Sequence, residues 1–310
     1  MSSPEPDFSR VVGHAGPKQF FRGVLSHGRV PPGFLFHGES GRGKKLFATE
    51  LLSSLFAGGP SLENHPDVEL LAPEEGKTTI PIARLRDLKK WFALAPYQAD
   101  RKAALIADAH CLAVEAQNSL LKLLEEPPRN GLIILVTHEP GALLETIHSR
   151  LQSVFFGPVF GADAEQFIAQ RLGVGEKEAA TALSLSRGAP GAALAWLSDA
   201  SSRDLMALVP ALLGPRPGPF AFADEFFQSS GMRVAAKARQ RCRRLFEFAI
   251  ESLAQDQSPW GLDHDAETIA DLLDAKNRLS ANVSPRIVVE SLKIKIQRRL
   301  ASKRRRESSP

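Results

Sequence analysis

The sequence predicts an α/β domain followed by all-α domains, and three observations lead to this class. Short apolar runs alternate with amphipathic stretches from residue 33 to about residue 157, which is typical of a parallel sheet covered by helices on both faces. Beyond about residue 160 the patterns are helical and no further strand-like series follows. A Pro- and Gly-rich cluster, GPRPGPF (214–220), interrupts that helical part.

The first domain contains five apolar runs that we expect to be strands. They are FLFHG (34–38), DVELLAP (67–73), AALIAD (103–108), LIILVT (132–137) and SVFF (153–156). The amphipathic segments between them predict helices at 44–56, 82–94, 114–125 and 141–147. Two prolines and a glycine in LLEEPPRNG end the third helix before the next strand.

The rest of the chain predicts two helical domains. Residues 161–200 are rich in Ala and Gly, with a break at 186–194, and further helices are expected at 221–255, 264–279 and 285–301. Ser284-Pro285 suits the start of the last helix, because proline is favoured in a first helical turn. We therefore expect an α/β domain at 1–158 and a small helical domain at 159–205. A second helical domain is expected at 206–302, followed by a basic, disordered tail at 303–310.

Composition places the chain among ordinary globular proteins. Of 310 residues, 43% are hydrophobic and 24% are charged. No apolar run reaches the roughly 18 residues that a membrane span needs, and the start, MSSPEPDFSR, lacks the features of a secretory signal. Two distant cysteines, Cys111 and Cys242, are too few for a cysteine zinc site. We expect a cytoplasmic protein without a disulfide, a metal site or a membrane partner.

The positive charge is concentrated near the C-terminus. The net charge is +4, but residues 291–306 hold eight basic residues and no acidic one. Without them, 31 basic residues (39 − 8) face 35 acidic residues, which leaves −4. A nucleic-acid surface over the whole protein is therefore not indicated, and we interpret the basic segment as a solvated terminus.

Residues 34–52, FLFHGESGRGKKLFATELL, contain a phosphate-binding loop pattern between an expected strand and an expected helix. Such a loop holds phosphate through backbone N–H groups, a helix N-terminus and a lysine. The candidate nucleotide-binding residues are Gly38, Gly41, Gly43, Lys44 and Lys45. The last of these replaces the Ser or Thr whose hydroxyl coordinates magnesium, and an ammonium has no lone pair for a metal.

A second departure follows the strand AALIAD. Asp108 takes the place of the carboxylate that faces the metal, but the next residue, where a glutamate would activate water, is Ala109. Alanine cannot act as a general base. Departures at two chemical positions predict a chain without ATPase activity of its own.

The stretch 103–152 contains three distinctive segments: AALIADAHCLAVEAQNSLLKLLEEPP, LIILVTHEP and LLETIHSRLQ. With the loop pattern they resemble the bacterial clamp-loader AAA+ ATPases of the DNA polymerase III holoenzyme, and within them the delta-prime family. The resemblance covers roughly residues 8–160 and, more weakly, NVSPRIVVESL (282–292). It implies an AAA+ P-loop domain, a small helical lid and a helical collar that oligomerises.

The resemblance also implies roles for individual residues. The family's Ser-Arg-Cys motif, whose arginine reaches the ATP of the next subunit, reads here Ser149-Arg150-Leu151. Thr137 corresponds to the polar sensor of the fourth strand. The lid's nucleotide-sensing arginine corresponds to Gly191, and the motor subunits' four-cysteine zinc module is missing. Residues used on a subunit's own ATP are lost, whereas Arg150, used on a neighbour's ATP, is kept.

This asymmetry implies a non-hydrolysing stator of the clamp loader. The expected partners are the gamma/tau and delta subunits in a hetero-oligomeric ring, with the sliding clamp and primer–template DNA bound through the complex. No cofactor is assigned with certainty: ATP binding without hydrolysis stays open, and zinc is not expected. The alternatives are an ATP-hydrolysing gamma/tau-type motor and a stand-alone P-loop protein that binds nucleic acid through its basic tail. A small-molecule P-loop kinase is more remote.

Overall fold

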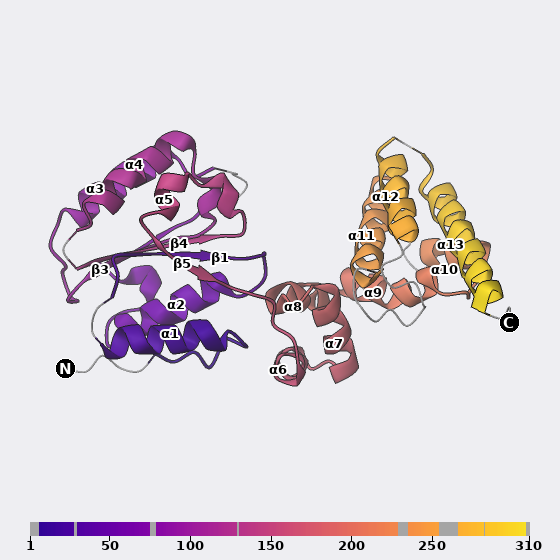
Figure 1. The fold of residues 1–310 in the computed structure, drawn as a ribbon, viewed down its shortest axis with the longest axis horizontal. Helices are drawn as coiled ribbons and strands as arrows, with labels where there is room; N and C mark the ends of the chain where they lie inside the picture. The colour runs from indigo at the N-terminus through magenta and orange to yellow at the C-terminus, as the bar shows by residue number, and fades with distance from the viewer. Residues whose placement is uncertain are drawn as a thin grey trace. The chain divides into compact units, whose positions relative to one another are not determined.

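A computed structural model describes residues 6–27, 30–74, 79–128, 130–228, 235–253, 266–281 and 283–307. The chain divides into two compact units (Figure 1). The first unit is Met1–Phe167 together with Gly188–Ala192, and the second is Ile168–Arg187 together with Ala193–Pro310. The finer division expected at residues 158, 205 and 302 stays a prediction. In the described part of the chain, no helix is long and apolar enough to cross a membrane.

The first unit is built on a parallel sheet of five strands in the order β2-β3-β4-β1-β5. Each strand lies within a residue or two of its predicted position: β1 (Gly33–His37), β2 (Val68–Leu71), β3 (Lys102–Ile106), β4 (Gly131–Thr137) and β5 (Gln152–Phe155). The central strands are buried on both faces, as near-continuous apolar runs require. The predicted class, a P-loop α/β domain with helical domains, is confirmed.

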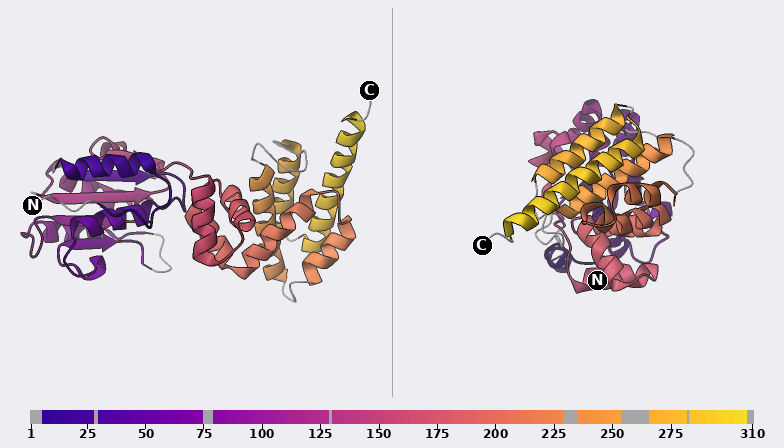
Figure 2. Two further views of the ribbon diagram at one scale, coloured as in Figure 1. Left: turned by 90° about the horizontal axis from the view of Figure 1, so that it is seen from below. Right: turned by 90° about the vertical axis from the view of Figure 1, so that its right-hand side faces the viewer.

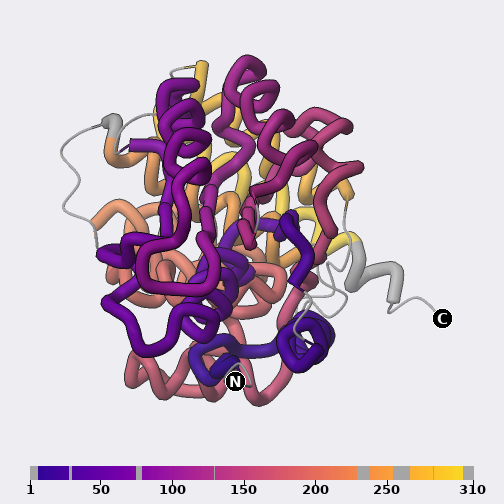
Figure 3. Tube along the Cα trace, turned by 90° about the vertical axis from the view of Figure 1, so that its left-hand side faces the viewer, coloured from indigo at the N-terminus to yellow at the C-terminus, as the bar shows by residue number. Residues whose placement is uncertain are grey.

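Helices cover both faces of the sheet (Figures 1 and 3). On one face lie α1 (Ala15–Ser26) and α2 (Lys44–Leu55). On the other lie α3 (Ile82–Phe92), α4 (Val114–Glu125) and the short α5 (Glu145–His148). Helix α1 was not predicted from the sequence. It was wrong to expect one helix over 141–147, because this stretch is a 3₁₀ turn, Pro140–Ala142, followed by the single turn of α5.

Aromatic packing fixes α1 and α2 to the sheet. Phe21 of α1 lies 4.9 Å from Phe34 of β1, measured between ring centroids, and Phe47 of α2 lies 5.8 Å from Phe36. All four side chains are essentially inaccessible to solvent. Burying a side chain of this kind stabilises a fold by about 1.5–3 kcal/mol. The start of α2, which bears the phosphate loop, is therefore held by a rigid core.

The described elements of the second unit are all helices (Figure 2). In chain order, counting two that cross the boundary between units, they are α6 (Ala162–Leu172), α7 (Glu176–Leu185), α8 (Pro190–Ser198), α9 (Ala200–Leu213), α10 (Pro219–Gln228), α11 (Ala235–Leu253), α12 (Ala266–Ser280) and α13 (Pro285–Glu307). The predicted start of the last helix at Pro285 is confirmed. This helix continues to Glu307 and so includes residues expected to form the tail.

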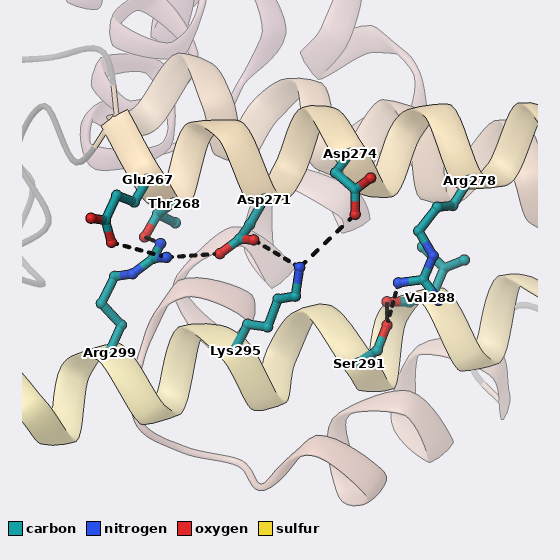
Figure 4. A network of polar contacts seen from close by, with 9 residues as sticks. All are labelled: Glu267, Thr268, Asp271, Asp274, Arg278, Val288, Ser291, Lys295 and Arg299. Carbon is teal, nitrogen blue, oxygen red and sulfur yellow. Dashed lines mark hydrogen bonds and ion pairs between the residues drawn. The ribbon is translucent and has the colours of Figure 1, made fainter.

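Three basic residues of α13 form hydrogen bonds or ion pairs with other helices of the second unit. Lys293 is fully buried and donates hydrogen bonds to the carbonyl groups of Ala211, Leu212 and Gly214 at 2.5, 3.0 and 2.5 Å, where α9 ends. Lys295 and Arg299 form ion pairs with carboxylates of α12 (Figure 4). The interpretation as a solvated terminus was therefore wrong for Lys293, whereas Lys295 and Arg299 are held in ion pairs and Lys295 stays half-exposed.

Candidate functional site

Glycine is required at the start of the phosphate loop. Gly38 has a φ of 137°, and a Cβ atom there would lie 2.4 Å from the carbonyl oxygen of Phe156. Gly43, directly before α2, has a φ of 81°, a conformation that side-chain-bearing residues rarely adopt. The predicted strand, glycine-rich loop and helix are thus all present, in the local geometry of a phosphate-binding loop.

Lys44 points back into its own loop. Its Nζ donates hydrogen bonds to the carbonyl oxygens of Gly38 and Glu39, both at 2.6 Å, and the residue is only 6% exposed. Burial and the positive charge of Arg42 lower the pKa of Lys44 to about 8, against the opposing attraction of Asp108 and Glu39. Phosphate oxygens could take over the two hydrogen bonds only by displacing these carbonyl groups.

Lys45, by contrast, is exposed. It lines an open pocket of about 420 Å³ together with side chains that include Thr49, Ser53 and Leu71. Its ammonium offers no lone pair, so it cannot coordinate magnesium as the usual hydroxyl does.

Asp108 and Thr137 lie at the same edge of the sheet as the loop, because β1 and β3 both pair with β4. Asp108 follows β3 and is exposed, with a φ of 51°. Thr137, the last residue of β4, is 1% exposed, and its Oγ1 accepts a 3.0 Å hydrogen bond from the N–H of Glu139. Ala109 is fully buried, so the place of a catalytic glutamate is part of the core. The structure therefore brings the loop, Asp108 and Thr137 together, with the buried Ala109 in the place of the catalytic glutamate.

Two histidines at this edge were not predicted as site residues. The rings of His110 and His138 meet edge to face, with 4.1 Å between their centroids. Ligand atoms of Asp108, His110 and His138 all lie within 4.8 Å of one another. The histidines are 28 positions apart in the sequence, and only the pairing of β3 with β4 brings them together. The pattern Asp-x-His directly after a strand is the one feature that could have suggested the cluster.

The position of the missing lid arginine is packed against the loop. The N–H of Gly191 donates a 2.8 Å hydrogen bond to the carbonyl oxygen of Gly41, and a Cβ atom at Gly191 would lie 2.8 Å from that same oxygen. An arginine therefore does not fit at residue 191 in this conformation. The nearby Arg187 is bound to Glu251 within the second unit.

Arg150 lies at the end of α5 and contacts α4 and α5. Its Nη2 donates a 2.8 Å hydrogen bond to Oε1 of Glu125, and its Nη1 donates to the Thr146 carbonyl at 2.9 Å and to Ser149 Oγ at 3.3 Å. The Arg150 and Glu125 side chains are 34% and 50% exposed. The next residue, Leu151, is buried in the core, which explains why an apolar residue is accommodated there.

A buried amide joins α4 to the segment that leads into α5. Gln117 Nε2 donates hydrogen bonds to the carbonyl groups of Leu112 and Ala142, both at 3.0 Å. Its Oε1 accepts a 2.8 Å hydrogen bond from the N–H of Leu144. All the polar capacity of this amide except one lone pair is used, as burial requires.

The first unit is similar in sequence to known proteins. Residues 13–160 match the family described as "DNA polymerase III, delta subunit". The matched segment, just under half of the chain, is similar to this family. A "DNA polymerase III subunit delta'" of Escherichia coli (strain K12) is 36% identical over 131 residues, which are 42% of this chain and 39% of that protein.

Further matches agree with this family. A "DNA polymerase III subunit gamma/tau" of Mycobacterium bovis is 32% identical over 161 residues, covering 46% of this chain and 27% of that protein. The chain therefore spans less than half the length of these curated relatives. A solved "gamma subunit-related protein" of Thermotoga maritima, at 19% identity and a TM-score of 0.53, covers 91% of this chain and 99% of that one. This last likeness concerns the fold alone.

The residues at the loop do not suit the magnesium ion that serves ATP hydrolysis in the P-loop fold. Magnesium takes oxygen ligands in octahedral geometry, whereas this edge places two imidazoles beside the carboxylates of Asp108 and Glu139, and Lys45 offers no lone pair. The backbone N–H groups of the loop remain suited to phosphate. Nucleotide binding without hydrolysis therefore stays a prediction for this chain.

Proposed function

We propose that the chain is a delta-prime-type subunit of a clamp loader, which hydrolyses no ATP itself and presents Arg150 to ATP bound by a neighbouring motor subunit. One observation carries this proposal. Among the described residues, Arg150 is at the surface and is held by an exposed glutamate and by groups at the end of α5, whereas Lys45 and Ala109 stand where a motor subunit would carry the metal-binding hydroxyl and the catalytic glutamate.

The chemistry of Arg150 suits this role. A guanidinium is planar and permanently charged, and its N–H groups match pairs of phosphate oxygens. An arginine supplied in trans to a nucleotide can raise the rate of phosphoryl transfer about 10³- to 10⁵-fold. In the free chain the guanidinium of Arg150 is hydrogen-bonded to Glu125. In the assembled ring, the phosphates of ATP bound by a neighbouring subunit would replace that carboxylate.

The proposed partners follow from the family. The gamma/tau and delta subunits would form the hetero-oligomeric ring, and the sliding clamp and primer–template DNA would be bound through the assembled loader. The second unit would form the contacts between subunits of the ring, which is the role that the resemblance implies for the collar. This chain would act as a fixed member of the ring, against which the motor subunits move during replication.

The test is the ATPase activity of the chain alone and in the loader assembled from its own organism's subunits, with clamp and primed DNA. We expect no turnover alone, and a loader rate that falls at least 10-fold with Arg150→Ala while assembly is unchanged. Arg84→Ala is the matched control, because Arg84 forms a comparable surface ion pair with Glu69 in the same unit. An unchanged rate with Arg150→Ala, in an intact loader, would refute the proposed role.

The second candidate function is the motor subunit itself, since gamma/tau subunits are also among the relatives. It requires turnover by the isolated chain that disappears with Lys44→Ala. The buried Ala109 and the tight contact of Gly191 with Gly41 argue against it.

The third alternative is a protein that binds nucleic acid through its basic tail. It is weakened because Lys293, Lys295 and Arg299 form hydrogen bonds and ion pairs within the second unit.

A further inference from the structure

We propose that Asp108, His110 and His138 form a binding site for a divalent transition-metal ion, with zinc as the best match. The ligand atoms of the three side chains lie within 4.8 Å of one another. In a tetrahedral zinc site with bonds of about 2.0–2.2 Å, neighbouring ligand atoms are roughly 3.3 Å apart. A small rotation of the exposed Asp108 side chain and the two partly buried histidines would close this difference. The site is independent of the role proposed for Arg150.

Neighbouring groups are placed to orient the two imidazoles. Nδ1 of His110 lies 3.3 Å from Oγ1 of Thr137, which leaves Nε2 of the same ring for a metal. His138 Nε2 lies 3.3 Å from Oε1 of Glu139, a second carboxylate beside the cluster. Hydrogen bonds of this kind to ligating histidines fix the ring and its tautomer in metalloproteins.

The donor set selects the metal. Two imidazole nitrogens and one carboxylate oxygen suit zinc and related ions, which prefer imidazole to all-oxygen sites. Magnesium and calcium take oxygen ligands and are disfavoured here. Three protein ligands would leave the fourth position to water or to Glu139.

The charges around the cluster favour an ion in spite of one nearby cation. Asp108 and Glu139 together balance the charge of a divalent ion. Lys44 is the nearby cation, and its Nζ is bound to the carbonyl groups of Gly38 and Glu39.

A bound ion would join the ends of two neighbouring strands. Asp108 and His110 follow β3, and His138 follows β4. The phosphate loop follows β1 at this same edge of the sheet. The ion would therefore crosslink the strand ends that lie beside the loop.

The experiment is zinc binding to the full-length protein without a histidine tag, by equilibrium dialysis and titration calorimetry, with cobalt(II) absorption to report the ligands. We expect one ion per chain, and affinity at least 10-fold weaker in each of Asp108→Asn, His110→Asn and His138→Asn. His27→Asn, at an exposed histidine in a different segment, and Cys111→Ser, beside the cluster, should bind like the parent chain. Zinc should raise the Tm of the parent chain and not that of His138→Asn.

Several results would overturn the assignment. Parent protein that binds no more zinc than the His110→Asn/His138→Asn double variant has no such site. Loss of binding in Cys111→Ser, or thiolate charge-transfer absorption with cobalt, would place the ion on sulfur instead. If a ligand variant fails to fold, the cobalt spectrum of the parent chain still decides whether the ligands are nitrogen and oxygen.

Discussion

Glu125, the last residue of α4, accepts a 2.8 Å hydrogen bond from Arg150, the second residue after α5. The two residues are 25 positions apart and lie at the ends of neighbouring helices. Both side chains are partly exposed, so the pair is open to solvent and to a partner. Glu125 thus holds the guanidinium at the surface without burying it.

We first predict that Glu125→Ala changes the stability of the isolated chain only slightly. Exposed ion pairs contribute about 0–1 kcal/mol, so the free energy of unfolding in urea should fall by about 1 kcal/mol or less. In the assembled loader the ATPase rate should fall less than with Arg150→Ala, because the arginine remains but is less well oriented. A double-mutant cycle with Arg150→Ala measures the coupling, and a coupling above about 2 kcal/mol would contradict the view of a loose surface pair.

The contact between Gly191 and Gly41 gives a second prediction. Gly191→Ala places a Cβ atom 2.8 Å from a backbone oxygen and should destabilise the first unit by about 1–3 kcal/mol, as overpacking does. Gly16→Ala is the matched control, since a Cβ atom at Gly16 meets nothing within 4 Å and helix α1 favours alanine. Hydrogen exchange in the phosphate loop would reveal the difference. Equal protection in both variants would show that the loop tolerates the added methyl group.

The lowered pKa of Lys44 predicts how the stability of the chain depends on pH. Its pKa is lowered from 10.5 to about 8 in the folded chain, by burial and then by Arg42. Between these two values the unfolded chain binds more protons, so the free energy of unfolding should rise with pH, by at most about 1.4 kcal/mol per unit for one proton. Urea unfolding of the parent chain and of Lys44→Met measures this contribution. The difference between them should increase from pH 8 to 10.5; a decrease would mean that folding raises the pKa.

Lys293 and Lys295 lie two positions apart on α13 and should differ sharply in importance. Lys293→Met leaves the carbonyl groups of Ala211, Leu212 and Gly214 without their donor, at a cost of about 3 kcal/mol or more, because each unsatisfied buried group costs about 1–3 kcal/mol. Lys295→Met loses half-exposed ion pairs, which should cost about 1 kcal/mol or less. Hydrogen exchange in α9 measures both, and equal effects would contradict the buried position of Lys293.

The sheet was predictable because its strands are near-continuous apolar runs between amphipathic segments. The end of each run also placed the loop, Asp108 and Thr137 at strand ends. Helix α1 was missed: it precedes the first expected strand, outside the alternation of strand and helix patterns on which the prediction rested.

Other features depend on contacts between distant residues. The pairing of β3 with β4 brings His110 to His138, and no local pattern contains that information. The burial of Lys293 likewise depends on where α9 ends against α13. Glu125 as the partner of Arg150 follows from the packing of α4 against α5, which sequence spacing alone does not specify.

The buried amide of Gln117 has a mechanical consequence. It ties α4 to the backbone on both sides, at Leu112 and at the segment that leads into α5, while α4 packs on the core of the sheet. A force applied to Arg150 by a neighbouring molecule would be transmitted through α5 and Gln117 to the sheet. The helices α4 and α5 would then move together with the sheet. Such stiffness lets one surface side chain bear force without yielding locally.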